Sequence, residues 1–168
     1  ALEGVFMDVC RTNRVTLGAC KGYPSLTFLY EMSERMKLAE ERGKNCIILY
    51  FGDYDPSGED IPRSIKENLI KLGVRSIELR RILLMKEQVI EWELPPAHAK
   101  ITDSRTANWD GLGQVELDAV EPRKLQRLCQ EAIDEIFDPQ LYDDLLDEEN
   151  TESTAFTIEL RNYVNDEL

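Results

Sequence analysis

The feature that most restricts the fold is a run of six apolar residues, Cys46–Phe51, which ends directly in the segment Gly52-Asp-Tyr-Asp-Pro-Ser-Gly58. A strand that is apolar at every position is typical of a parallel sheet that is covered on both faces. Glycine, proline and aspartate in the following segment predict a turn. The pattern therefore predicts a buried strand whose carboxyl end bears two aspartates.

Segments on either side of this strand predict an α/β fold. The short apolar segment Val15–Cys20 and the partly polar segment Val74–Leu84 are both predicted to be strands. Between them we expect one helix that begins after Ser25 and ends at Gly43, and a second that covers about Glu59–Leu72. Alternating strands and helices at this spacing are typical of parallel βαβ units, with helices on both faces of the sheet.

The second half of the chain is predicted to be less regular. Lys86–Trp92 is expected to form a short helix, and Glu93–Gly113 is a long polar connector of a kind that is often functional or mobile. Val115–Val120 is a short extended candidate, and Pro122 marks the start of another helix. From Pro139 onward the sequence predicts two acidic helical segments.

Asp53 and Asp55 are the candidate catalytic and metal-binding residues. Alternate side chains of an extended backbone point the same way, so we expect both carboxylates to project from the carboxyl end of the strand. Two carboxylates that lie side by side repel each other unless a cation lies between them. Mg²⁺ suits such a pair, because it keeps several waters and completes its coordination with substrate phosphate. The carboxyl edge of a parallel sheet is also where open α/β folds bind ligands.

The residues after the aspartates predict a helix N-terminus that binds phosphate. Ser57 and Asp60 resemble a capping box, and the free N–H groups near Ser57 and Gly58 would bind a phosphate. Lys21-Gly22, at the end of the preceding predicted strand, is expected to reach the same edge. The same residues also fit a plain turn followed by a helix N-cap, and the local sequence leaves both interpretations open.

The net charge of −13 excludes a protein that binds nucleic acid by charge alone, since that mode needs clustered basic residues. The acidity is concentrated at one end of the chain. The first 130 residues contain 20 acids and 19 bases, whereas Glu131–Leu168 contains 13 acids and one base. The part of the chain that contains the aspartate pair is therefore close to neutral.

Histidine and cysteine chemistry is not expected. The four cysteines are far apart and form no C-x-x-C pair, and His98 is the single histidine, which argues against a zinc site and a histidine-dependent nucleophile. The chain also has no apolar run near the roughly 20 residues that a membrane span needs. We therefore expect a cytoplasmic protein that does not bind membranes.

Two motifs resemble the Toprim domain, the metal-binding module shared by topoisomerases, primases and some nucleases. Cys20-Lys-Gly-Tyr-Pro-Ser25 and Gly52-Asp-Tyr-Asp-Pro-Ser-Gly58 are similar to the K-G-Y-P turn and the G-D-x-D-P-x-G loop of one branch. That branch contains the A subunit of topoisomerase VI and the meiotic double-strand-break transesterases. Glu116-Leu-Asp-Ala-Val-Glu-Pro122 is similar to a segment of stand-alone bacterial and phage relatives. The resemblance implies a Rossmann-like three-layer Toprim fold with a mainly parallel central sheet over residues 1–137, followed by an acidic helical extension over residues 138–168.

The resemblance also implies roles for individual residues. The aspartate pair would bind the metal, and Lys21 and Gly22 would line the adjacent loop. The first strand of the family ends in a glutamate that acts as a ligand or as a general acid or base, and we expect this strand and its glutamate to lie upstream of Ala1. Glu3 lies about one helical turn further on, so it is not expected to replace that glutamate.

The leading functional hypothesis is a phosphoryl-transfer domain that acts on nucleic acid, with DNA as the expected substrate and Mg²⁺, or Mn²⁺ in its place, as the cofactor. Such a domain would be a nuclease, a nicking enzyme or part of a topoisomerase-like protein. Because neither the near-neutral part of the sequence nor the acidic tail supplies the basic residues for a positively charged cleft, we expect the chain to bind nucleic acid weakly by itself. A homodimer or a partner domain would be one way to strengthen that binding.

Other interpretations stay open. Lys100 and Arg105 in the long connector are candidate phosphate contacts, although a solvated, mobile loop is the favoured interpretation. The alternative function is a Toprim scaffold that binds metal or nucleotide without cleaving nucleic acid. Its acidic tail would then dock a basic partner or mimic the charge of DNA. A tail that only keeps the protein in solution is the plainest interpretation of residues 138–168.

Overall fold

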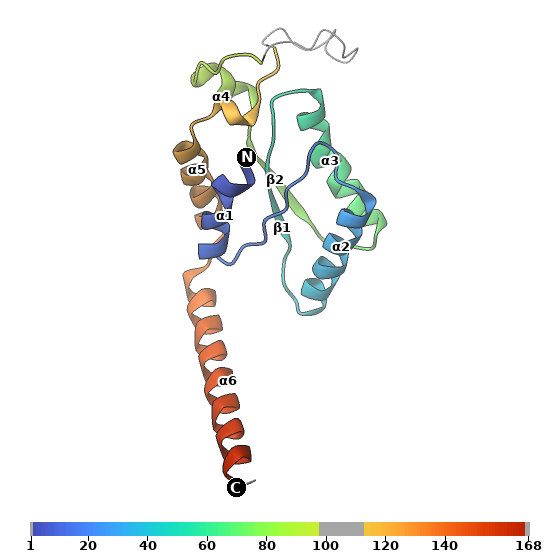
Figure 1. Cartoon of the computed structure of the whole chain (residues 1–168). Coiled ribbons are helices and arrows are strands. Elements are labelled where there is room, and N and C mark those ends of the chain that lie inside the picture. Colours follow the sequence, from blue (N-terminus) through green and yellow to red (C-terminus); the bar gives the residue numbers. More distant parts are fainter. Residues whose placement is uncertain (1, 98–112, 167–168) are drawn as a thin grey trace. The chain divides into compact units, whose positions relative to one another are not determined.

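A computed structural model describes residues 2–97 and 113–166 of the chain (Figure 1). The fold is mixed α/β and mostly helical. It forms two compact units, Ala1–Ala132 and Ile133–Leu168. The described residues of the first unit contain a small parallel sheet of two strands, and the second unit is dominated by one long helix.

The sheet confirms the strand predicted at the apolar run. Strand β1 (Ile47–Phe51) pairs in parallel with β2 (Glu78–Leu83), and helix α3 (Pro56–Lys71) connects them. The pairing register slips between Tyr50 and Phe51. This β1-α3-β2 unit is the parallel crossover that the alternating sequence pattern predicts.

Helices lie on both sides of the two strands. Helix α2 (Leu26–Glu41) and α3 are on one side, and helices α1 (Leu2–Thr12) and α5 (Pro122–Asp134) are on the other (Figure 1). The predicted start of α2 is confirmed, because Ser25 is its N-cap and its hydroxyl accepts a hydrogen bond from the main-chain N–H of Phe28.

One hydrophobic cluster joins α2 and α3 to the sheet. Its members are apolar side chains from both helices and from the turn before β2, with side chains of both strands packed against it. The buried members are Leu29, Ile61, Ile65, Leu69, Val74 and Ile77, and the partly buried ones include Ile48, Tyr50 and Leu79. Burial of this apolar surface holds the crossover helix on the sheet.

Side-chain contacts also fix α1 against β1 and α5. The rings of Phe6 and Phe51 lie 5.0 Å apart, and Asn13 and Gln130 exchange two side-chain hydrogen bonds. Cys10 and Cys129 are both buried and hydrogen-bonded to each other, and burial raises the pKa of Cys129 to about 12. These thiols therefore pack as small apolar groups.

The predicted strand at Val15–Cys20 is wrong. These residues form no strand, and Val15 is exposed. A strand is stable only when a neighbour satisfies its main-chain groups, and no strand of the described residues pairs with this segment. The segment instead forms the connection between α1 and α2.

The burial predicted for β1 is also wrong in degree. All five residues of Ile47–Phe51 are half-buried instead of fully covered. The described sheet has only two strands, so each strand has an edge without a neighbour. An apolar sequence therefore lies partly open to solvent in this structure.

Three further helical elements complete the description. They are α4 (Lys86–Glu91), the 3₁₀ turn η2 (Leu117–Ala119) and α6 (Pro139–Asp166). The short helix predicted at Lys86 is confirmed, whereas the two acidic segments predicted after Pro139 form one continuous helix. Among the described helices, none has both the length and the apolar character needed to cross a membrane.

Candidate functional site

The aspartate pair lies where β1 gives way to α3. Asp55 is the N-cap of α3, and its Oδ1 accepts a hydrogen bond from the main-chain N–H of Gly58. The capping pair predicted at Ser57 is therefore wrong, because the helix already begins at Pro56. Proline is favoured at the first helical position and aspartate at the N-cap, so Asp55-Pro56 outcompetes the serine that follows.

Asp53 is held by a segment that is distant in sequence. Its Oδ1 accepts a hydrogen bond of 2.7 Å from the main-chain N–H of Leu117. The next residue, Tyr54, forms two main-chain hydrogen bonds with Val115, of 2.8 and 3.0 Å. The segment Val115–Leu117 therefore fixes the position of the Asp53 carboxylate at the end of β1.

The charge of Asp55 is close enough to affect the ionisation of Asp53. Burial raises the pKa of Asp53, and the negative charges of Asp55 and Asp118 raise it further, whereas the hydrogen bond from Leu117 lowers it. Among the described residues, the second oxygen, Oδ2, of Asp53 and of Asp55 has no hydrogen-bond partner. Each carboxylate is thus oriented through one oxygen and has the other available for a ligand.

Two glycines allow the loop its close approaches. A Cβ atom on Gly58 would lie 2.1 Å from the main-chain oxygen of Asp53, so a side chain does not fit there. A Cβ atom on Gly52 would lie 2.3 Å from the Tyr50 hydroxyl. The Gly52 contact is with the end of a side chain, whereas the Gly58 contact is with the backbone.

The loop with Lys21 and Gly22 contacts α3 near its N-terminus, at Asp60. The Tyr23 hydroxyl donates a hydrogen bond of 2.6 Å to Oδ2 of Asp60, and this bond, together with Arg63, lowers the pKa of Asp60. Gly22 has a φ of +76°, a conformation that glycine adopts without strain. The structure therefore brings this loop to the helix end that contains Ser57 and Gly58.

Three residues of the site were missed by sequence reasoning. Arg81 of β2 donates from Nη2 to the main-chain oxygens of Asp53, at 3.1 Å, and Leu84, at 2.6 Å, and its buried Nε has no partner among the described residues. Tyr50 has a pKa raised to about 12, chiefly by burial, with the charge of Arg81 opposing the rise. The third is Asp118, for which the segment Glu116-Leu-Asp was the only sequence signal.

Arg81 has a clear structural role at this position. The main-chain ladder between the strands extends to Gly52, whose N–H donates to Leu83 and whose oxygen accepts from Leu84. After that point, the Arg81 guanidinium donates to one main-chain oxygen of the segment that follows each strand, Asp53 after β1 and Leu84 after β2. It also places a positive charge beside the aspartate loop.

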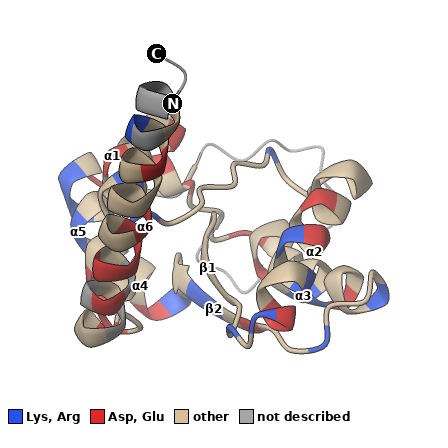
Figure 2. Ribbon diagram, turned by 90° about the horizontal axis from the view of Figure 1, so that it is seen from below, with Lys and Arg blue, Asp and Glu red and all other residues tan. Residues whose placement is uncertain are grey.

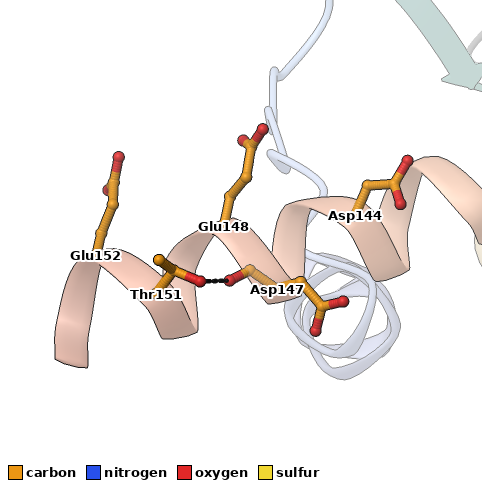
Figure 3. A pocket seen from close by; sticks show the side chains of 5 residues that line it. All are labelled: Asp144, Asp147, Glu148, Thr151 and Glu152. Carbon is orange, nitrogen blue, oxygen red and sulfur yellow. Dashed lines mark hydrogen bonds between the residues drawn. The ribbon is translucent and has the colours of Figure 1, made fainter. Parts of the chain in front are cut away.

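The remaining candidate residues and the hollow on α6 contribute no further side chain to the aspartate site. Lys100 and Arg105 lie outside the described residues. Within the residues that are described, no group of three or more histidine, cysteine and acidic side chains is arranged to hold a metal ion. A shallow hollow of about 700 Å³ is lined by side chains of α6 alone, which are Asp144, Asp147, Glu148, Thr151 and Glu152 (Figure 3).

The geometry provides two carboxylate oxygens for a hard cation next to a helix N-terminus that favours anions. A divalent ion held there would lie at the carboxyl edge of a parallel β-strand pair, the edge at which open α/β folds bind ligands. Comparisons of the chain with protein-family models, with curated proteins and with solved structures found no match.

Proposed function

We propose that this chain is a Toprim-like domain that binds Mg²⁺ or Mn²⁺ through Asp53 and Asp55 and transfers phosphoryl groups in nucleic acid, as a nuclease or nicking enzyme. The observation that carries the proposal is the position of the two carboxylates. They lie together at the carboxyl end of β1, each oriented through one oxygen, beside the N-terminus of α3. DNA is the proposed substrate.

The finer fold assignment is part of the same proposal. A Rossmann-like three-layer Toprim fold is supported by the parallel β1-α3-β2 crossover and by helices on both sides of the strands (Figure 1). The order of the two motifs along the chain adds to this support, since the K-G-Y-P turn precedes α2 and the aspartate loop precedes α3.

The donor set suits a cation that needs few protein ligands. Burial raises the pKa of Asp53, the charges of Asp55 and Asp118 raise it further, and a bound cation would relieve the repulsion between these charges. Such an ion would stabilise negative charge on the scissile phosphate and on its leaving oxygen. The chain's own contribution is to orient the carboxylates, through the N–H groups of Leu117 and Gly58, before any ligand arrives.

Metal binding is tested with substitutions that keep the local hydrogen bonds. Asp53→Asn and Asp55→Asn retain an oxygen acceptor for Leu117 and Gly58 but lose the negative charge. We expect each to weaken Mn²⁺ binding by at least about tenfold in calorimetric titration. Asp8→Asn, an exposed position on α1, is the matched control and should bind as the parent does. Equal affinities in all four proteins would remove the ligand assignment.

Cleavage is tested on supercoiled plasmid with Mg²⁺ or Mn²⁺. We expect the protein that includes the upstream strand and glutamate implied by the resemblance, and its Asp8→Asn variant, to convert plasmid to the relaxed form. The Asp53→Asn and Asp55→Asn variants of the same protein should leave it supercoiled. Relaxation that continues without divalent cations, or that survives both substitutions, would contradict the proposed mechanism.

A second candidate is a Toprim-like scaffold that binds a cation without cleaving nucleic acid. One observation favours it: both carboxylates already have structural hydrogen bonds, and no group of three metal-binding side chains is arranged among the described residues. Mn²⁺ binding that depends on Asp53 and Asp55, with plasmid left intact after long incubation, would select this candidate over the nuclease.

A further inference from the structure

Helix α6 exposes large apolar side chains along much of its length. It has 28 residues, which corresponds to about 42 Å. Every residue from Asp147 to Arg161 is exposed. Phe156, Leu160 and Tyr163 are 64%, 49% and 65% exposed, respectively. Side chains of this size are normally covered in a folded protein, so this helix has an apolar surface without a partner in the described residues.

These three side chains share one face of the helix. Their separations of four and three residues place them one above the other along the axis. We call this surface the 156–163 face. The same alternating spacing continues toward the helix start through Ser153, Glu149, Leu146 and Tyr142. The face is therefore apolar in its last two turns and polar in the middle of the helix.

The charge of α6 is strongly one-sided. The helix contains eight acidic residues and one basic residue, Arg161, and Figure 2 shows the acids distributed along it. Figure 3 shows Asp144, Glu148 and Glu152 projecting from the same side at four-residue intervals. Like charges at this spacing destabilise a helix, and most helices in proteins are stabilised by packing of one face against a partner. Neutralisation by a positive partner would remove this cost.

The charge pattern disfavours a second copy of α6 as that partner. In helix pairs, residues that flank the apolar stripe face each other, and complementary charges there select the partner. Glu152 and Glu159 flank the stripe of α6, and its single base, Arg161, cannot complement the eight acids of a second copy. Two copies would bring like charges together, whereas lysines or arginines opposite these glutamates would attract.

We propose that the 156–163 face docks a basic amphipathic helix of another protein, whose apolar residues cover Phe156, Leu160 and Tyr163 and whose lysines or arginines pair with Glu152 and Glu159. The apolar contact supplies the affinity and the charges supply the selectivity. This docking surface is independent of the aspartate site and of the function proposed for it.

The test uses the full chain and a designed helical peptide of about 21 residues, with leucine at the a and d positions and lysine at e and g. Binding is measured by fluorescence anisotropy of the labelled peptide at about 0.15 M salt. We expect Phe156→Ser/Leu160→Ser to weaken binding by at least about tenfold, and Glu152→Lys/Glu159→Lys to do the same. Thr154→Ala, away from the face, is the matched control and should bind as the parent does.

Three results would overturn the proposal. Equal binding by the parent and by Phe156→Ser/Leu160→Ser would show that the acids attract the peptide without the apolar face. A stable dimer of the parent in analytical ultracentrifugation that Phe156→Ser/Leu160→Ser dissociates would assign the face to a second copy instead. A version of the peptide with glutamate in place of lysine should not bind, and its binding would equally contradict the charge argument.

Discussion

At the residue scale, Asp55 combines a structural role with a proposed metal-binding role. Its Oδ1 caps α3 through the N–H of Gly58, and its charge adds to the repulsion at Asp53. Asparagine caps a helix about as well as aspartate but has no charge, whereas alanine has neither a capping oxygen nor a charge. Substitution at this one position can therefore separate the two roles.

We predict that Asp55→Ala lowers the free energy of unfolding by about 1 kcal/mol, while Asp55→Asn changes it by only a few tenths. The reason is that alanine leaves the N–H of Gly58 without its acceptor. Urea denaturation at neutral pH measures both values. Equal losses for the two variants would mean that the charge, and not the cap, stabilises the start of α3.

Gly58 and Gly4 offer a second comparison at this scale. A Cβ atom at Gly58 would meet the Asp53 oxygen at 2.1 Å, whereas one at Gly4 in α1 would have no atom within 4 Å. We predict that Gly58→Ala destabilises the protein by about 1–3 kcal/mol through overpacking. Gly4→Ala should instead stabilise it by about 0.5–1 kcal/mol, because alanine favours the helix. Urea denaturation of both variants measures whether the two changes in unfolding free energy have the opposite signs expected.

At the element scale, Glu40 connects the end of α2 to the segment before β2. Its Oε1 accepts hydrogen bonds from the main-chain N–H groups of Ser76, at 2.7 Å, and Arg75, at 2.9 Å. The bond from Ser76 and then those from Arg75 hold the pKa of Glu40 below its ordinary value of 4.5. A carboxylate thus ties two elements that are far apart in sequence.

This connection predicts a specific pH dependence. Because the folded-state pKa of Glu40 is lower than the unfolded one, its stabilisation is complete above the ordinary value of 4.5 and is lost as the pH falls through the lowered pKa. The difference in unfolding free energy between the parent and Glu40→Gln should be largest near pH 7 and should shrink below about pH 4. A difference that stays constant between these pH values would exclude the carboxylate charge as its cause.

The start of α6 is also encoded locally. The Asp138 side chain accepts a hydrogen bond from the N–H of Gln140, and the rings of Phe137 and Tyr142 lie 5.2 Å apart across it. A polar cap between two contacting apolar residues is the pattern of a hydrophobic staple. These contacts lie entirely within the second unit, so α6 does not need the sheet to define where it begins.

At the scale of the whole molecule, the buried apolar residues of the described chain all lie at or before Ile133. We therefore predict that a chain that ends at Phe137 unfolds at the same urea concentration as the full chain. Its far-ultraviolet circular dichroism should lose the signal of the 28 residues of α6. A clearly lower midpoint for the shortened chain would show that the C-terminal helix contributes to the stability of the first unit.

The sequence by itself determined features that depend on neighbouring residues. The apolar run became β1, Ser25 became the cap of α2, and the aspartates came to the carboxyl end of the strand. Such features follow from hydrophobic period, turn residues and capping, which act over a few residues. The acidic helix after Pro139 was predictable for the same reason, although its continuity was not.

Only the tertiary structure decided which distant segments meet. It brought the N–H of Leu117 into hydrogen-bonding distance of Asp53 and the guanidinium of Arg81 into hydrogen-bonding distance of the aspartate loop. It also brought Asp118 close enough for its charge to raise the pKa of Asp53. It also left Val15–Cys20 without a strand partner, although that segment has a strand-like composition. Local propensity can favour an extended backbone, but a strand and a site each need groups supplied from elsewhere in the chain, and no local pattern specifies which groups those are.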